Sequence, residues 1–368
     1  MTRLAVLHVS MFMALYAQMD LRIENSNFTL QESLKQSNKR YMYNYDRLRL
    51  QLDASHDGWF GNAMIDGVHL LGGDYIHSDW FDLQTAIKPD TPFAIESAIH
   101  RYDDGAYYGK IHRLYGGYET MTQRLSVGIQ KISMGVGRIW TPTDLFNPKN
   151  SYALEVDEVY GVLAASYSYA FSDLGRISTV VSQRRDHSLK YAASVKTFLN
   201  AFDLGFNAIV SNETNMLGYE IEGNVLETGI EWRSEGGWFD NDTLNQSFFQ
   251  GIAGMDYGFE NGLTWVLEGY YSSKIFDETS VLDALESDLV SNRVTSHISM
   301  GSTLSYAINL YLDTSLLYIE SFDSGRFISP TLSYTFNDNN TFSLGAMMSQ
   351  DTADTYGNSF YFKWFFSY

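Results

Sequence analysis

The chain lacks several features that would place it in common protein classes. It has no cysteine, which excludes disulfide bonds and thiolate metal sites. Lysine and arginine number 25 against 44 aspartates and glutamates, and the net charge of -19 argues against nucleic-acid binding, which needs a basic excess. No stretch after the first residues approaches the roughly 18 uninterrupted apolar residues of a transmembrane helix. The chain is therefore not a helical membrane protein.

Motifs of common catalytic sites are also missing, since there is no HExxH, Walker loop or GxSxG. His297 and Ser299 share a strand face about 7 Å apart, but lumen packing is the simpler interpretation. His100, Asp103 and Asp104 could suggest the rim of an outer-membrane protease, but a solvated acidic loop is the preferred interpretation. We therefore expect no enzyme, no catalytic residue, no metal site and no cofactor.

The first residues have the pattern of an export signal. Arg3 precedes an apolar run from Leu4 to Tyr16, and Ala17 supplies a small residue at a cleavage point. This predicts a signal peptide over residues 1–17, with a buried N-terminal helix as the alternative. Residues 18–368 would then form one exported domain.

From Tyr41 onward, apolar and polar residues alternate. In RLRLQLDA, for example, Leu48 and Leu50 alternate with Arg47 and Arg49. Segments of about ten residues with this alternation and with aromatic ends are typical of outer-membrane barrels. A soluble β-sandwich also alternates, but its strands are shorter. We predict an all-β, transmembrane antiparallel β-barrel in a bacterial outer membrane.

The segment FYFKWFFSY shows the same alternation most strongly. Lys363 belongs to the face that would line the lumen, whereas five aromatic residues share the face that would contact lipid: Phe360, Phe362, Trp364, Phe366 and Tyr368. This segment is similar to the C-terminal signal that the barrel-assembly machinery reads, so that machinery is an expected partner, as is the lipid bilayer.

The lengths of the connections predict the topology. Periplasmic turns are short and extracellular loops are long, and the connections alternate in this way when they are counted back from Tyr368. The count requires a turn at Gly223-Asn224 and a further strand in the poorly patterned DLRIENSNFTL. It gives about 18 strands, or 16 if that N-terminal strand is absent. The connection at Lys274–Asn292 contains the acidic SVLDALESDLV, which predicts a short surface helix.

Charged residues between the lipid-facing positions must point inward, because Arg or Lys facing mid-membrane lipid costs ~2–4 kcal/mol. In the first half they form a predicted basic wall: Arg47, Arg49, Arg113, Arg124, Lys131, Arg176, Lys190 and Lys196. In the second half they form a predicted acidic wall, with Arg233 and Lys363 as exceptions: Glu220, Glu222, Glu227, Glu231, Asp256, Glu268 and Asp313. Opposed walls would create a transverse field across a water-filled pore; the alternative is a neutralised structural plug.

The connection over residues 138–159 is a candidate pore-constricting loop. Pro142 and Pro148 suit a loop, and Trp140, Leu145 and Phe146 need cover from water. Folding inward would give that cover, whereas an outward loop would instead need a partner. The constriction candidates are Trp140, Asp144, Asn147, Glu155, Asp157 and Glu158, with the carboxylates directed towards the basic wall.

The same stretch resembles a group of porin-like outer-membrane proteins with a W-x-P-T-D-x-x-N-P loop. The matching residues are Trp140, Pro142, Thr143, Asp144, Asn147 and Pro148, while Ile129 and Met134 replace an Arg and a Trp that are common there. Alginate-export-like barrels and the porin of porin–cytochrome complexes have related arrangements. The resemblance implies a barrel and does not specify its cargo.

Together these features predict a porin for passive or weakly selective diffusion of small polar or charged solutes. The acidic loops favour cations at the mouth. The alternative function is a barrel that sheathes a periplasmic multihaem cytochrome, and an outer-membrane enzyme is a third possibility.

Overall fold

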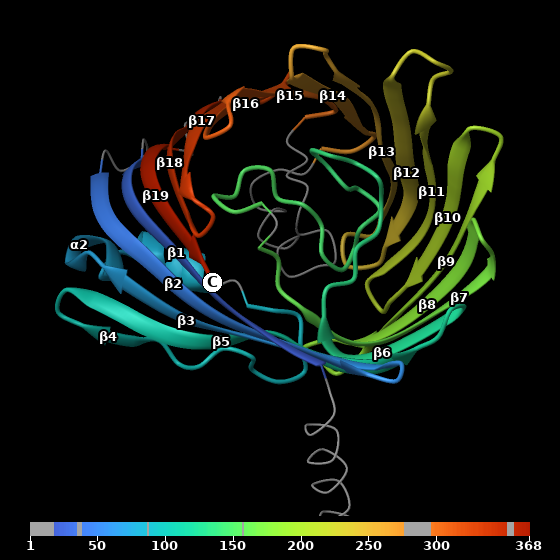
Figure 1. Ribbon diagram of the computed structural model, residues 1–368, viewed down its shortest axis with the longest axis horizontal. Coiled ribbons are helices and arrows are strands. Elements are labelled where there is room, and N and C mark those ends of the chain that lie inside the picture. Colours follow the sequence, from blue (N-terminus) through green and yellow to red (C-terminus); the bar gives the residue numbers. More distant parts are fainter. Residues whose placement is uncertain (1–17, 35–38, 87, 157, 276–295, 352–356) are drawn as a thin grey trace, which may run out of the picture.

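The computed structural model describes residues 18–34, 39–86, 88–156, 158–275, 296–351 and 357–368. Antiparallel strands form a closed ring (Figure 1), in which 18 strands make the barrel wall and β4 pairs only with β5. The first strands are β1 (Gln18–Leu34), β2 (Lys39–His56), β3 (Trp59–Leu71), β4 (His100–Tyr102), β5 (Gly105–Glu119), β6 (Gln123–Gln130), β7 (Val162–Ser172), β8 (Gly175–Gln183), β9 (Leu189–Leu199) and β10 (Phe202–Val210). The others are β11 (Thr214–Asn224), β12 (Ile230–Asn241), β13 (Gln246–Gly258), β14 (Leu263–Ser272), β15 (Ile298–Asn309), β16 (Leu312–Ser321), β17 (Gly325–Asn337), β18 (Asn340–Asp351) and β19 (Asn358–Ser367).

The barrel closes through β1, which pairs with β2 on one side and with β19 on the other. The predicted strand in DLRIENSNFTL therefore exists, and the alternative count of 16 is wrong. Closure gives each of the 18 wall strands a hydrogen-bonded neighbouring strand on both sides. A strand can cross hydrocarbon only under that condition.

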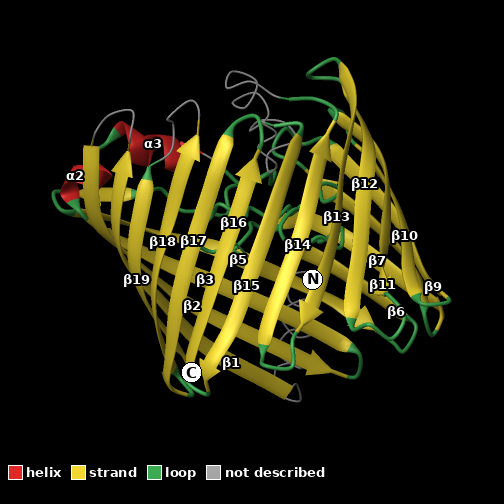
Figure 2. Cartoon of the chain, turned by 90° about the horizontal axis from the view of Figure 1, so that it is seen from above, coloured by secondary structure: helices red, strands yellow, loops and turns green. Residues whose placement is uncertain are grey.

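Short turns gather at one end of the barrel and longer connections at the other (Figure 2). The expected turn within YEIEGNVLETGIEWR is present, because β11 ends at Asn224 and β12 starts at Ile230. The short helices α2 (Gly73–Ile76) and α3 (Asp79–Ala86) lie at the end with the longer connections. By turn length, that end is extracellular. The helix expected in SVLDALESDLV lies outside the described residues.

Neither described helix has the length and apolar character that a bilayer crossing requires.

The two faces of the wall differ as the alternation predicts. On β19, Phe360, Phe362 and Trp364 are 51%, 42% and 39% exposed on the outer face. Lys363 lies on the lumen face between them, paired with Phe28 of β1. Phe366 and Tyr368 continue the outer row towards the periplasmic end. Such an apolar exterior belongs against lipid tails.

The chain leaves the wall after β6 and returns at β7. The connection, residues 131–161, lies within the ring in Figure 1 and is called the inner segment below. It starts earlier than the predicted loop 138–159, since β6 ends at Gln130. The Ile132 N–H donates to the side-chain oxygen of Asn147 at 2.7 Å and not to a neighbouring strand.

Candidate functional site

The inner segment packs its apolar side chains against the lumen wall. Ile139, Trp140, Leu145 and Phe146 are all at least nine-tenths buried, in one cluster with wall residues such as Phe239. The Trp140 ring lies 5.7 Å from that of Tyr270 on β14. The inward folding expected from these side chains is therefore what the structure has.

Glu235 of β12 is the main polar anchor of the inner segment. Its side chain is fully buried, and its carboxylate accepts the backbone N–H groups of Val136, Gly137 and Thr143 and the Thr143 hydroxyl. The bonds from Gly137 and from the two Thr143 donors measure 3.0–3.1 Å. A buried carboxylate needs such donors, since burial without them is costly.

Two further wall carboxylates bind the backbone in the same way. Glu268 accepts the N–H groups of Arg138, Ile139 and Trp140 at 2.8–3.1 Å. Glu220 accepts the Gly135 N–H at 2.8 Å and forms an ion pair with Lys196 of the basic wall. These two members of the predicted acidic wall are buried behind the inner segment, so they fix it in place and do not face open lumen.

Three further members of the predicted acidic wall surround two arginines. Arg138 of the inner segment contacts Glu222, Glu231 and Asp256 at 2.8–3.3 Å. The fully buried Arg233 also pairs with Asp256 through a 2.8 Å bond from Nη1. Two guanidinium groups thus offset three carboxylates on this side of the lumen. The structure places Glu227 in the exposed β11–β12 turn and Asp313 at an exposed lumen-facing position of β16, apart from this cluster.

The TDLFN turn holds the two ends of the inner segment together. Asp144 Oδ1 accepts the N–H groups of Phe146 and Asn147, and Oδ2 accepts that of Met134 at 3.1 Å. Asn147 in turn donates to the Tyr160 carbonyl. Burial raises the pKa of Asp144 to about 6, although the three N–H donors oppose the shift. Asp144 was expected to face the basic wall. Its hydrogen bonds come from the backbone of its own segment, and the charge of Lys190 of the basic wall also acts on it.

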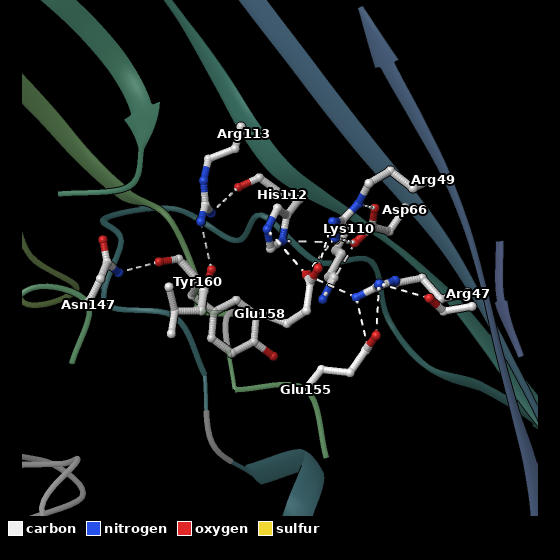
Figure 3. A network of polar contacts seen from close by, with 12 residues as sticks. Arg47, Arg49, Asp66, Lys110, His112, Arg113, Asn147, Glu155, Glu158 and Tyr160 are labelled. Carbon is white, nitrogen blue, oxygen red and sulfur yellow. Dashed lines mark hydrogen bonds and ion pairs between the residues drawn. The ribbon is translucent and has the colours of Figure 1, made fainter. Parts of the chain in front are cut away.

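The far end of the inner segment does reach the basic wall (Figure 3). Glu155 contacts Arg47 at 3.0 Å and Lys363 at 3.1 Å. Glu158 contacts Arg47 at 2.9 Å and Arg49 at 2.7 Å. Asp157 lies outside the described residues.

The wall beneath these carboxylates is itself a dense network. Arg49 makes a two-bond pair with the buried Asp66 of β3 at 2.7 and 2.8 Å, and Lys110 lies 3.6 Å from the same carboxylate. Burial would raise the pKa of Glu158, but the hydrogen bond from Arg49 and the charges of Arg47 and Arg49 lower it to about 2. Cationic side chains still outnumber carboxylates in this network. The cations are Arg47, Arg49, Lys110, Arg113 and Lys363, and the carboxylates are Asp66, Glu155 and Glu158.

The other basic-wall candidates are not equivalent. Arg113 donates to the carbonyls of His112 and Val159, and Lys190 donates to that of Leu145 at 2.8 Å, so both tie the wall to the inner segment. Arg124, Lys131 and Arg176 are exposed. Arg124 and Lys131, together with Arg113, line a polar cavity of 510 Å³ that also contacts Asp53, Asn62 and Gln130.

Sequence reasoning missed several of these residues. Glu235 was absent from the predicted acidic wall. Its spacing of two from Arg233 would have put it on the lumen face. Lys110 of β5 was likewise absent from the predicted basic wall. Among the described residues, no group of three or more His, Asp or Glu side chains is arranged to hold a metal ion.

Solved structures of outer-membrane proteins share this architecture, whereas no protein-family model and no curated protein sequence matches the chain. OpdK from Pseudomonas aeruginosa superposes with a TM-score of 0.62 at 8% identity, over 95% of this chain and 98% of that chain. OccAB2 from Acinetobacter baumannii gives 0.60 at 9% identity, with the same coverage. OpdK has also been solved with vanillate, with a TM-score of 0.58 at 10% identity, over 96% of this chain and 98% of that chain. The chain thus has the fold of a bacterial outer-membrane β-barrel; these likenesses give no support to an alginate-export or porin–cytochrome type.

Proposed function

We propose that the chain is an outer-membrane channel for small polar or charged solutes, constricted by the inner segment. The observation that carries this proposal is the segment's attachment to both sides of the lumen. Glu220, Glu235 and Glu268 hold one part, and Arg47 and Arg49 hold the other. A segment fixed at both ends narrows the lumen to a defined passage and is not free to swing out.

The polar cavity beside the inner segment supports passage rather than complete closure. Its walls carry Arg113, Arg124 and Lys131 together with neutral amides and hydroxyls, such as Gln130 and Ser126. Such a lining replaces part of a solute's hydration and favours negative charge locally. At the mouth, the acidic exterior loops and the net charge of -19 favour cations instead. We therefore expect weak selectivity between anions and cations.

The likeness to OpdK is compatible with this reading. Vanillate, which is present in one OpdK structure, is a small aromatic carboxylate. For the present chain, a small carboxylate is one member of the polar and charged class that the cavity suits. The sheath for a cytochrome has less support, since the inner segment occupies the space that a protein partner would need.

Liposome swelling tests the proposal directly. Liposomes containing the purified chain should swell in small sugars, amino acids and carboxylates, and the rate should fall steeply with solute size. Liposomes with heat-denatured chain are the control. Absence of swelling for every small solute would refute the channel, and co-purifying haem would favour the cytochrome sheath.

A further inference from the structure

Lysine and arginine side chains on the barrel wall point into the lumen at nearly every position. The direction follows from the alternation of each strand, because neighbouring residues face opposite sides. On the described wall strands, Arg40 of β2 and Arg326 of β17 are the exceptions. Arg40 lies an odd number of positions from the lumen-facing Arg47, and Arg326 directly precedes Phe327, whose ring contacts that of Tyr152 in the inner segment. Both outward arginines are exposed.

The two outward arginines lie at the extracellular end of the wall. Each is the second residue of a strand that descends from that end, and β18, β19 and β1 lie between the two strands (Figure 2). Four strand spacings therefore separate them, or about 19 Å across the wall. An arginine that faces lipid is costly at mid-depth and much less so near the interface. These two cations thus suit the level at which the head groups of the outer leaflet begin.

A mainly apolar hollow of 580 Å³ lies below both arginines on the same outer face. Met42, which is two positions below Arg40 and 73% exposed, lines it on β2. Pro330, which is four positions below Arg326 and thus about 13 Å further along the strand, lines it on β17. The other outward side chains of its lining are Thr29, Gln31, Thr314, Leu332, Leu344, Ala346, Phe360 and Phe362. The hollow therefore spans the strands that separate the two arginines.

A continuous stripe of outward side chains leads from Arg326 into the hollow. Arg326 lies opposite Gln350 of β18, and its Nε donates to the Gln350 side chain at 2.9 Å, which orients the guanidinium group at the rim. Ile328 and Met348 form the next outward pair, and Pro330 follows at the hollow. A molecule bound to Arg326 can therefore extend along apolar surface into the hollow.

The charges of both outward arginines remain for a ligand. Glu320 of β16 lies opposite Arg326, but its carboxylate accepts the Tyr318 hydroxyl. Within the part of the chain that the structure describes, neither Arg40 nor Arg326 forms an ion pair. The surface thus combines two separated cations at the level of the head groups with one hollow at the level of the acyl chains.

We propose that this surface binds one lipid of the outer leaflet whose head group carries two phosphates. Arg40 and Arg326 each bind one phosphate, because a guanidinium group pairs with phosphate oxygens through parallel N–H bonds. The hollow opens towards hydrocarbon, so an acyl chain of the same lipid fills it beside Phe360 and Phe362. A lipid with a single phosphate satisfies only one of the two arginines. The site lies on the outer face, so binding does not depend on conduction through the lumen.

Native mass spectrometry of the full chain in detergent tests the two phosphate contacts. The probes are diphosphoryl and monophosphoryl lipid A with identical acyl chains. Wild type should retain one diphosphoryl molecule and bind the monophosphoryl form at least tenfold more weakly. Arg40→Met with Arg326→Met should reduce diphosphoryl binding at least tenfold. The matched control, Arg124→Met with Arg176→Met, removes the same charge from exposed positions on the lumen face and should bind like wild type. Equal binding of the two probes, or unchanged binding by the Arg40 and Arg326 double variant, would overturn the proposal.

The hollow is tested separately from the arginines. Gln31→Trp fills part of the hollow and leaves both arginines in place, so diphosphoryl binding should again fall at least tenfold. Leu217→Trp is the control, since Leu217 is 71% exposed on the outer face of β11 across the ring. Millimolar inorganic phosphate should not displace the lipid. Unchanged binding by Gln31→Trp, or displacement by inorganic phosphate, would contradict a site for head group and acyl chain together. Gel mobility with and without heating checks that each variant has folded.

Discussion

Replacing Glu235 by alanine should release the inner segment from the lumen wall. The change removes the acceptor of three backbone N–H groups and one hydroxyl. A hydrogen bond to a charged group contributes ~1.5–3 kcal/mol, but four bonds to one carboxylate are not additive. Water entering from the lumen replaces part of the loss. We therefore expect the docked state to lose about 3–5 kcal/mol, which raises the released fraction by a factor on the order of 10²–10⁴.

Single-channel recording and limited proteolysis would measure this release. The Glu235→Ala channel should visit a larger conductance more often than wild type, and protease should cut within residues 131–161 faster. Glu235→Gln keeps one acceptor oxygen, so its conductance and its rate of proteolysis should lie between those of wild type and Glu235→Ala. Asp313→Asn makes the same charge change as Glu235→Gln, at an exposed position on β16, and should match wild type. Unaltered conductance and protease resistance in Glu235→Ala would refute the anchoring role.

Three further predictions concern the basic side of the lumen and the outer aromatic face. Arg49→Met leaves the buried Asp66 without its two-bond partner and should cost about 3–5 kcal/mol, lowering the thermal midpoint, whereas the exposed Arg176→Met should leave it unchanged. The pKa of Glu158 is lowered from an ordinary value of 4.5 to about 2. Its ion pairs therefore stabilise the inner segment fully above pH 4.5, and this stabilisation is lost as the pH falls towards 2. Wild-type protease resistance should thus persist from pH 7 to about pH 5, and Glu158→Gln should already show the acid behaviour at pH 7; identical pH profiles would contradict this. Phe366→Ser with Tyr368→Ser should reduce the amount of assembled barrel in the outer membrane, while Ser367→Thr on the alternate face should not, and equal amounts would argue against an assembly signal there.

The barrel could be predicted from the sequence because its two constraints are local. A strand between lipid and water alternates with period two, and the length of each turn depends on the membrane side. Counting turns thus located β1 although Asn25, Asn27, Thr29 and Gln31 give part of its outer face a polar character, and it separated β11 from β12. In the sequence, this polar stretch showed only as a poor pattern.

The site was less predictable because its contacts join distant segments. The sequence offered an inward-folding loop near Trp140, with an outward loop as the alternative, and directed Glu155 and Glu158 towards the basic wall without naming their partners. It could not indicate that wall carboxylates bind backbone N–H groups, because such donors have no sequence signature. Glu220 and Glu268 therefore looked like pore-lining charges, and Asp144 looked free to face the lumen.

Single-channel recording of the wild-type chain in a planar bilayer tests the central claim most directly. We predict discrete conductance steps that are smaller than those expected for an open 18-stranded barrel, with weak charge selectivity, because the inner segment remains in the lumen. A purified, folded barrel that inserts into the bilayer and gives no steps would contradict the channel. Steps of full open-barrel size would contradict the constriction.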